Sequence, residues 1–335
     1  MVHSGGDTQP DELGIGKPVN RQLDGKLVVM LGGSGFFGRH VAQELLARGA
    51  RLRIASRHPE RAYALKPLAA LGQVQSLRCD VTNAASLAGA LAGANAVINL
   101  VGAFAGNLDA LQGVGAGRIA AAARDAGATA FVHVSALGAD RASPVDYART
   151  KAEGEVAVLA AFPEASVLRP SILFGPDDTF VNRFAGLIAA FPVMPVFGPA
   201  ARLQPVLVDD AAAAAVQALC DPARHGGTIF EIAGPEVMTM LEFNQRIAKA
   251  QGRRRLFAEL PDAVSGGFAS LTGWLPGAPI TSDQWALLKA GKFASGTLPG
   301  IDALGIVPRP LGLFLDRWMV RYRAHGRFGT APSKD

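Results

Sequence analysis

The stretch VMLGGSGFFG, residues 29–38, places four glycines directly behind an apolar run. Glycine costs stability unless the backbone must turn where other residues cannot, or another group must approach it closely. Gly32, Gly35 and Gly38 recur at every third position, between a strand pattern and a helix pattern. We expect the first to form a tight turn, the second to admit a pyrophosphate and the third to let the helix pack closely. The spacing predicts a dinucleotide-binding loop; the alternative is a tight turn without a ligand.

A helix pattern follows the glycines. In RHVAQELLARGA, residues 39–50, apolar side chains recur at helical spacing up to Gly49, which ends the helix. The first N–H groups of a helix are unpaired and carry partial positive charge. We therefore expect the backbone of Phe36 and Phe37 to contribute to binding the anion.

Strand patterns alternate with helix patterns through the first half of the chain. After the apolar run KLVVML, strand patterns recur at RLRIAS, VQSLRCDV, AVINLVGAF, AFVHVSAL and ASVLRPSILFG (residues 51–56, 74–81, 96–104, 130–137 and 165–175). Alanine-rich helix patterns separate them. Such alternation is typical of crossover units with helices on both faces of a parallel sheet. The predicted fold class is α/β, a Rossmann-type doubly wound parallel sheet.

The chain divides into three parts. Residues 1–25 are polar and interrupted by Gly and Pro, which predicts a disordered lead-in. Residues 26–175 form the predicted NAD(P)-binding Rossmann domain. Residues 176–328 carry a looser pattern, and we interpret them as a smaller C-terminal substrate-side region. Because strand patterns recur near 204–210 and 227–233, we expect these segments to return to the sheet, so that the two parts interleave.

Composition excludes several classes of protein. The 335 residues are 49% hydrophobic with a formal net charge of +5. Arginines are dispersed, with one tight run at 253–255 that we interpret as a solvated face, which argues against nucleic-acid binding and leaves acidic lipid headgroups open. Cys79 and Cys220 form no disulfide framework, and no histidines pair at ligand spacing, so we expect no metal and a reducing compartment. No apolar run approaches the roughly 18 residues that cross a bilayer, which predicts a cytoplasmic protein, soluble or peripheral at the inner face of the cytoplasmic membrane.

The second strand predicts the type of dinucleotide. NAD-binding sites usually carry an acidic residue at the end of this strand. IASRHPER, residues 54–61, has Ser56 and Arg57 there instead, so a 2′-phosphate would meet a hydroxyl and a guanidinium, and Arg39 could add to them. This favours NADP(H). The alternative is that Arg57 is a solvated loop charge, and NADH remains open.

A tyrosine and a lysine lie one turn apart in YARTKAEGEVAVLAAF, residues 147–162. A nearby ammonium favours the phenolate, so we expect Lys151 to lower the pKa of Tyr147 and to make it a proton donor for a carbonyl. Ser135, at a strand end, can hydrogen-bond the same oxygen. The alternative for the Tyr147–Lys151 pair is an ordinary helix surface.

These motifs together resemble the extended, atypical branch of the short-chain dehydrogenase/reductase superfamily, whose members include epimerase/dehydratase-like proteins. The matching motifs are GGSGFFG, RCDVTN, INLVG, YARTK, LRPSILFGP and QPVLVDDAA. The resemblance implies that Asp80 and Val81 lie by the adenine and that Pro170 and Ser171 lie near the nicotinamide. It also implies that the backbone of Leu100, Val101 and Gly102 lines the cofactor and that Lys151 holds the ribose.

More narrowly, residues 32–328 resemble the family of the nucleotide-binding accessory subunit of respiratory complex I. YARTKAEGE, AFPEASVLRPSILFGPDDTFVNRFA, IFEIAGPEVMT and RYRAHGRFG carry this resemblance. It implies bound NADPH and a structural role in the respiratory complex, whereas free-standing bacterial relatives resemble reductases of lipid-like substrates, including the keto group of ceramide-type lipids, and others are linked to quinone synthesis. Ser135 lies closer to Tyr147 than in many extended members, which departs from the pattern.

The second half offers a candidate membrane face. In LGLFLDRWMVRYRAHGRFG, one helical face carries apolar and aromatic residues and another carries basic ones. The first face comprises Leu315, Trp318, Met319 and Tyr322, the second Arg317 and Arg321, and an adjacent apolar lip comprises Phe268, Leu271 and Trp274. Such a helix can lie at a headgroup interface. The alternative is that both stripes pack on the core of this chain.

Two functions therefore compete. The first is an NADPH-dependent reductase of a lipid-like or quinone-like carbonyl, in which Tyr147 donates the proton, Lys151 holds the ribose and Ser135 steadies the carbonyl. The second is a binding module that holds NADPH as a structural ligand in respiratory complex I. Candidate neighbours of a substrate are Phe104, Phe174, Asn182 and Phe184.

Overall fold

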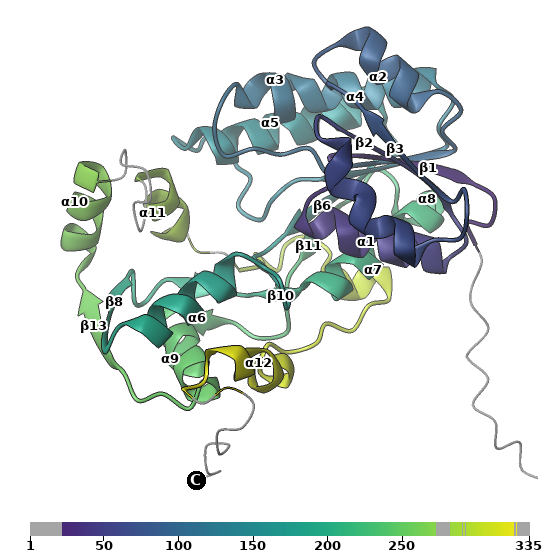
Figure 1. The fold of residues 1–335 in the computed structure, drawn as a ribbon. Helices are drawn as coiled ribbons and strands as arrows, with labels where there is room; N and C mark the ends of the chain where they lie inside the picture. The colour runs from purple at the N-terminus through teal and green to yellow at the C-terminus, as the bar shows by residue number, and fades with distance from the viewer. Residues whose placement is uncertain (1–21, 273–281, 290, 292, 325, 327–335) are drawn as a thin grey trace, which may run out of the picture.

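The computed structural model describes residues 22–272, 282–289, 291, 293–324 and 326. Its centre is a seven-stranded parallel sheet in the order β11-β6-β5-β4-β1-β2-β3 (Figure 1). The strands span β1 Leu27–Leu31, β2 Arg51–Ser56, β3 Val74–Arg78, β4 Ala96–Asn99, β5 Ala130–Val134, β6 Ser166–Pro170 and β11 Ile229–Ile232. The strand order reverses between β1 and β4, which places a ligand crevice at the carboxyl ends of these strands. The Rossmann-type doubly wound sheet is confirmed.

Helices cover both faces of this sheet (Figure 1). Alternate residues of a strand face opposite sides, and β1 follows this rule. Val28 and Met30 belong to one core cluster, whereas Val29 and Leu31 belong to another. The first cluster includes side chains of α1 (Phe36–Ala47), η1 (Pro59–Leu68) and α7 (Val208–Cys220), and the second includes side chains of α2 (Ala84–Leu91), α4 (Val114–Asp125) and α5 (Asp146–Ala161).

The expected lead-in, residues 1–25, lies outside the described residues up to position 21. Its last four residues form a turn rather than disordered chain. Leu23 is buried in the core beside α1, and its N–H donates to the carbonyl of Arg48, at 3.2 Å. The expected disorder is therefore wrong for residues 22–25, because the apolar side chain of Leu23 is buried in the core.

A second region packs around its own apolar cluster. Phe174 and Phe243 are fully buried at its centre. The elements of this region are α6 Phe180–Ala190, β8 Val193–Phe197, α9 Met240–Ala250, β13 Leu256–Leu260, α10 Asp262–Thr272, α11 Ser282–Lys289, α12 Gly312–Trp318 and η3 Met319–Tyr322. The remaining elements are short: α3 Leu108–Gln112, β7 Leu173–Phe174, β9 Arg202–Leu203, β10 Val206–Leu207, α8 Pro222–His225, β12 Met238–Thr239 and η2 Ile301–Leu304.

The two late strands differ in where they pair. β11, within the segment expected at 227–233, joins the central sheet beside β6. The segment 204–210 does not return to that sheet: β10 pairs with β7 in a separate two-stranded sheet, and α7 begins at Val208. The expectation for 204–210 was wrong because β11 already occupies the open edge of β6. In addition, Asp209 and Asp210 lie in the first turn of α7, where they favour a helix.

The basic run 253–255 is not a solvated face. The guanidinium of Arg253 donates to the carbonyl of Tyr322, at 3.1 and 3.0 Å, and Nε of Arg255 donates to the carbonyl of Ile188, at 2.7 Å. Both acceptors lie in the last turn of a helix, η3 and α6, where carbonyls are unpaired and cations stabilise. Only Arg254 of this run is exposed.

The expected membrane-facing helix packs on the core of this chain. Leu315 and Met319 are buried, and Trp318 and Tyr322 are half-buried against the same apolar cluster as Phe243. The apolar face predicted for the membrane is thus already covered. A helical stripe of this kind satisfies its hydrophobic requirement equally well against α6 and α9, because burial removes the same apolar area from water.

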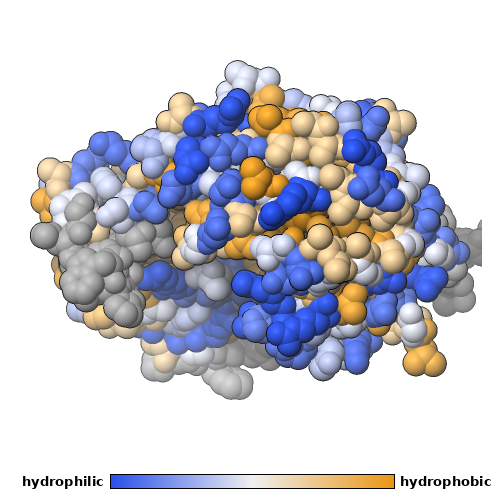
Figure 2. Space-filling model, turned by 90° about the horizontal axis from the view of Figure 1, so that it is seen from above, coloured by the Kyte–Doolittle hydropathy of each residue, from blue (hydrophilic) through white to orange (hydrophobic). Residues whose placement is uncertain are grey.

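The apolar lip expected beside that helix is only partly visible. Phe268 is 38% exposed and its ring lies 5.4 Å from that of Phe197, whereas the side chain of Leu271 and all of Trp274 lie outside the described residues. The view from above in Figure 2 shows hydrophobic side chains in separate patches among hydrophilic ones. None of the described helices combines the length and the apolar character that spanning a bilayer requires.

Candidate nucleotide-binding and catalytic site

Four strand ends meet at the carboxyl edge of the sheet. Leu31, the last residue of β1, pairs with Ala55 of β2 and with Asn99 of β4. The N–H of Gly32 donates to Ala55, at 3.0 Å, and that of Leu100 donates to Leu31, at 2.9 Å. The segments that follow β1, β2, β3 and β4 therefore begin at one level, which brings together the glycine loop and the other predicted cofactor-binding residues.

Two glycines of the loop have a steric reason, and a third faces open space. Gly32 has a φ of +74°, and a Cβ there would lie 3.1 Å from the backbone of Leu100. A Cβ on Gly38 would overlap the carbonyl of Gly33, 2.6 Å from its carbon, so only glycine lets α1 start so close to the loop. A Cβ on Gly35 meets no protein atom within 4 Å. Gly35 thus faces open space, as a residue that admits a phosphate must.

Helix α1 presents an uncovered N-terminus to this space. Gly35 is its N-cap, no side chain caps it and no acidic residue lies in its first turn. Phe36 and Phe37 lie in that turn as predicted, but their side chains point elsewhere. The ring of Phe36 packs on Gly175 and edge-to-face on His40, at 5.3 Å, while Phe37 packs on the core. Any contribution of the two phenylalanines to an anion site is therefore through backbone N–H groups.

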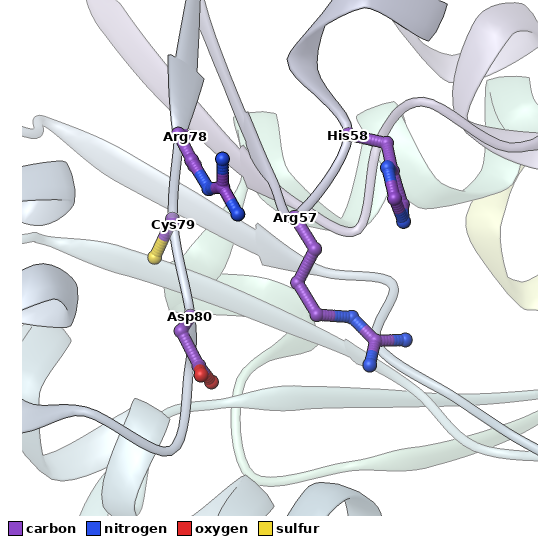
Figure 3. A pocket seen from close by; sticks show the side chains of 5 residues that line it. All are labelled: Arg57, His58, Arg78, Cys79 and Asp80. Carbon is purple, nitrogen blue, oxygen red and sulfur yellow. The ribbon is translucent and has the colours of Figure 1, made fainter.

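Beyond the loop, a cavity of about 210 Å³ lies at the ends of β2 and β3 (Figure 3). It is lined by Arg57, His58, Arg78, Cys79 and Asp80. In Figure 3, Arg57 comes from the end of β2, and Arg78 and Asp80 come from the end of β3 beside it. Among the residues the structure describes, neither guanidinium has a hydrogen-bonding or ion-pair partner. Two unpaired cations in one cavity make a site for an anion.

Arg78 and His58 were not predicted from the sequence. Ser56 pairs with Arg78 across β2 and β3, and this lateral pairing, not the linear sequence, brings the two arginines together. The hydroxyl of Ser56 is buried without a hydrogen-bond partner, which leaves a donor free beside the cavity. Placing the sequence of β3 beside that of β2 in register would have shown that Arg78 lies opposite Ser56.

Asp80 is exposed and held by its own turn. Its Oδ1 accepts hydrogen bonds from the N–H of Thr82, at 2.9 Å, and from the hydroxyl of Thr82, at 2.7 Å. These bonds, and to a smaller degree the charge of Arg57, lower the pKa of the Asp80 carboxyl. Val81 is half-buried against the core cluster under β3. Asp80 thus lines the cavity, whereas Val81 packs on the core beside it.

Arg39 does not reach this cavity. Its guanidinium pairs with the carboxylate of Asp177, in the loop after β7, and neighbouring His40 lies 2.6 Å from Asp209 of α7. The hydrogen bond with His40 lowers the pKa of Asp209. The expected contribution of Arg39 to a 2′-phosphate is therefore corrected: this arginine ties α1 to the second region.

Lys151 lies deep in the site. Its ammonium donates to the carbonyls of Val134, at 3.0 Å, and Val101, at 3.5 Å, at the ends of β5 and β4. A Cβ on Gly102 would lie 3.2 Å from Nζ, so glycine leaves room for the lysine. Burial lowers the pKa of Lys151 to about 8, against the opposing charge of Glu155. The Leu100–Gly102 backbone and Lys151 thus lie side by side.

Tyr147 differs from its expectation. Its ring stacks on Phe104, with centroids 4.5 Å apart and planes at 15°. Burial raises the pKa of Tyr147 to about 12 rather than lowering it. The expected lowering is absent because the ammonium of Lys151 is directed to backbone carbonyls, and the phenol hydroxyl has no hydrogen bond to any described residue. Phe104 is 74% exposed, so it covers the phenol from the solvent side.

Ser135 is turned away from a substrate. Its hydroxyl donates its single hydrogen to Oε1 of Glu155, at 2.5 Å. Glu155 is 3% exposed and accepts two further hydrogen bonds from Arg169, at 2.8 and 2.6 Å. The predicted donation from Ser135 to a substrate carbonyl is therefore corrected, because the hydroxyl already donates its hydrogen to Glu155, which is ion-paired with Arg169. Glu155, one turn after Lys151, is the signal in the sequence that was missed.

The remaining predicted neighbours separate into two groups. Pro170 and Ser171 end β6, where the carbonyl of Pro170 accepts from Leu137 and the N–H of Ser171 donates to Ile232, so their backbone is fixed between β5 and β11. Three predicted substrate neighbours belong to the second region instead, where Phe174 is fully buried, Phe184 packs on its core and Asn182 accepts hydrogen bonds from Arg321 and Tyr322. Phe104 alone of the four contacts a catalytic candidate.

No group of three or more His, Cys, Asp or Glu side chains among the described residues is arranged to hold a metal ion.

Comparison with known proteins agrees with this geometry. Residues 32–172 match the NAD(P)H-binding domain family. NADH dehydrogenase (ubiquinone) 1 alpha subcomplex subunit 9 of Mus musculus is 32% identical over 319 residues, which span 92% of this chain and 84% of that protein. The chain belongs to the family of these subunit 9 proteins. The resemblance drawn from its motifs is confirmed, and residues 32–172 form a domain for a nicotinamide nucleotide.

Two further similarities extend this result. The ceramide reductase of Caulobacter vibrioides is 32% identical over 240 residues, or 70% of this chain and 74% of that protein. An NADPH-dependent quinone oxidoreductase from Escherichia coli, in a structure with NADPH, superposes with a TM-score of 0.68 at 20% identity, covering 87% of this chain and 99% of that one. The second similarity concerns the fold alone.

Substitution of Gly35 and of Gly38 should separate the effect on nucleotide affinity from the effect on stability. Gly35→Ala places a methyl group in open space, so it should cost less than about 1 kcal/mol of stability but weaken NADPH binding at least about ten-fold. Gly38→Ala forces α1 away from the loop, and we expect a loss of about 1–3 kcal/mol in stability as well. Thermal unfolding without nucleotide and titration with NADPH measure the two effects. Equal unfolding temperatures for both variants would contradict the steric argument.

The buried lysine predicts a pH dependence of stability. Below pH 8, Lys151 is charged in both folded and unfolded chains, and its burial destabilises the fold. Its pKa is about 8 in the folded chain and 10.5 ordinarily, so between these values the unfolded chain keeps a proton that the folded chain has lost. The contribution of Lys151 to stability should therefore rise with pH in this window. The unfolding free energies of wild type and Lys151→Met, compared from pH 7 to pH 10, test this, with exposed Lys249→Met as control; a constant difference would contradict it.

Proposed function

We propose that this chain binds NADPH and reduces the carbonyl group of a lipid-like or quinone-like molecule. The observation that carries the choice of cofactor is the pair of unpartnered guanidiniums, Arg57 and Arg78, in one cavity beside the ribose end of the site. A carboxylate at the end of β2 would accept ribose hydroxyls, and here that position is Ser56. A 2′-phosphate supplies the two negative charges that two guanidiniums and a free hydroxyl favour.

The residues present fit the whole nucleotide. The space over Gly35 and the uncovered start of α1 suit the pyrophosphate. Asp80, which lines the cavity, and its neighbour Val81 suit the adenine, and Lys151 with the backbone of Leu100–Gly102 suits the ribose on the nicotinamide side. Pro170 and Ser171, fixed between β5 and β11, suit the nicotinamide.

The chain supplies the proton of the reduction. When bound, a reduced nicotinamide supplies the hydride that adds to the carbonyl carbon. Tyr147 gives its phenolic proton to the carbonyl oxygen, so that the products are an alcohol, the oxidised nucleotide and a phenolate that regains its proton from water. With a pKa of about 12, the phenol is fully protonated at neutral pH and ready to donate. For Lys151, one helical turn away, to stabilise the phenolate that forms, its ammonium has to turn from the carbonyls of Val134 and Val101 towards the phenol.

Phe104 would define the entrance to this donor. Its ring covers the phenol of Tyr147 and exposes an apolar face to solvent. A substrate with an apolar or aromatic part next to its carbonyl can replace or extend this stack, whereas a small polar carbonyl cannot. The name of the Caulobacter relative, a ceramide reductase, supports a lipid-like substrate.

The second candidate is a structural NADPH-binding subunit of respiratory complex I. Two observations favour it. The family includes NADH dehydrogenase subunit 9 proteins. In addition, the hydroxyl of Ser135 donates its hydrogen to Glu155, which also accepts from Arg169, and is therefore not available to a substrate carbonyl. The same residues that would hold NADPH for reduction would hold it as a permanent ligand. For either function, the location that we propose is the cytoplasm or the inner face of the cytoplasmic membrane.

Specificity for the 2′-phosphate is tested at both guanidiniums. Arg57→Gln and Arg78→Gln should each weaken NADPH binding about ten-fold or more, because each removes a charge-assisted hydrogen bond, and should leave NADH binding within about two-fold. Arg61→Gln, an exposed arginine outside the cavity, serves as control. Isothermal titration with both nucleotides measures the effect. A wild type that binds NADH more tightly than NADPH would overturn the choice of cofactor.

Catalysis is tested at the phenol. Tyr147→Phe should keep NADPH affinity within about two-fold and lower turnover about 10²–10⁴-fold, since it removes only the donated proton. Oxidation of NADPH in the presence of keto-lipids and short-chain quinones is followed by absorbance, with Tyr322→Phe as a matched control. If wild-type protein retains NADPH through purification but oxidises it with none of these carbonyls, and fractionates with complex I, the structural function holds instead.

A further inference from the structure

A basic and apolar surface lies on the connection between β2 and β3, in residues 61–71. The segment is fixed from within: Ala62 and Leu65 are buried in the core cluster that also covers α1. Its end is tied to the sheet, because Nε2 of Gln73 donates to the carbonyl of Ala50, at 2.9 Å. What this segment exposes is therefore held in place by the fold.

The outer side of the 61–71 segment carries large apolar side chains. Tyr63 and Leu68 are each 53% exposed, and Leu71 is fully exposed. Beside Leu71, a surface hollow of about 380 Å³ is lined by Lys66, residues 69–72 and Val74. Single exposed apolar residues are normal on a protein surface, but three within nine positions, one of them lining a hollow, concentrate apolar area on this segment.

The charges of the segment all have one sign. Arg61 and Lys66 are exposed, and Nζ of Lys66 lies 4.4 Å from the centroid of the Tyr63 ring. No acidic residue occurs between positions 61 and 71. Glu60, just before, lies 3.2 Å from Nδ1 of His58. Cations next to exposed leucine and tyrosine are the combination that binds an anionic headgroup layer, since the ammonium meets phosphate while the apolar side chains enter the interface.

We propose that the 61–71 segment docks this chain on an anionic membrane surface. The inference does not depend on the proposed function, because it uses none of the nucleotide-binding or catalytic residues. It replaces the C-terminal helix as the membrane-facing element, since the apolar face of that helix is buried. Docking would hold the chain at the surface where a lipid-like substrate resides.

A second exposed apolar surface serves as the contrast. Val193 of β8 and Leu256 of β13 are paired in register and are 47% and 72% exposed. Exposed Arg254 precedes Leu256, the acidic residues Glu259 and Asp262 follow it, and Lys289 pairs with Asp262 at 3.8 Å. This surface offers apolar area without an excess of positive charge, so it should not select anionic lipid.

Vesicle binding tests the proposal with the full chain. Sedimentation with vesicles of phosphatidylcholine containing about 30% phosphatidylglycerol should capture the protein, and pure phosphatidylcholine should capture much less. Arg61→Gln and Lys66→Gln should each weaken capture about five-fold, and about 0.5 M salt should weaken it further. Leu68→Ser with Leu71→Ser should weaken it at least ten-fold, because apolar insertion is lost. Leu256→Ser is the matched control and should leave capture unchanged.

A spectroscopic readout shows which surface inserts. Leu71→Cys carrying an environment-sensitive fluorophore should shift to the blue with the anionic vesicles, whereas Leu256→Cys with the same label should not. Because all these positions are exposed, unfolding temperatures should stay at the wild-type value and confirm that the variants fold. The proposal is overturned if wild type binds neither vesicle, if it binds both equally, or if only the Leu256 variants change. Failure here leaves nucleotide binding and turnover intact, so it is distinguishable from failure of the proposed function.

Discussion

The close approach of α1 to the loop before it sets the geometry of the whole site. A Cβ on Gly38 would overlap the backbone of Gly33, and Gly32 combines a positive φ with a tight approach to the backbone of Leu100. These contacts place an uncovered helix N-terminus at the point where the strand order of the sheet reverses. From there, the ends of β2 and β3 present two arginines, and the ends of β4 and β5 present carbonyls to Lys151. A nicotinamide nucleotide fits this arrangement because backbone, not flexible side chains, defines its centre.

The sheet and the glycine loop were predictable because each depends on local pattern: an apolar run, a glycine with positive φ, a helical repeat. What escaped prediction depends on lateral neighbours. Arg78 joins Arg57 only because β3 pairs with β2, and Ser135 turns away only because Glu155 and Arg169 meet beside it. The stripe with Leu315 and Met319 also failed as a membrane signal, since an amphipathic pattern does not say whether its apolar side meets lipid or the same chain's core.

The two candidate functions share almost every contact, which explains why the motifs alone do not separate them. Lys151 is as useful for holding a ribose as for stabilising a phenolate. The difference lies around Tyr147: its phenol is protonated and shielded by Phe104, and the neighbouring serine is committed to an ion pair. A subunit that retains its nucleotide without turnover is compatible with this arrangement, whereas a reductase requires that Phe104 move aside when the substrate binds.

The position of β11 has a consequence for how the chain can be divided. This strand comes from residues 229–232, long after the second region has begun, yet it completes the sheet beside β6, with Ile229 opposite Val167 and Ile232 opposite Pro170. A fragment that stops near residue 175 would leave the backbone N–H and C=O groups along one side of β6 unpaired. Such an open sheet edge can pair with another molecule. Residues 26–175 are therefore not a separable domain that can be exchanged between relatives. Recombination within this family should succeed only where the borrowed piece includes its own last strand.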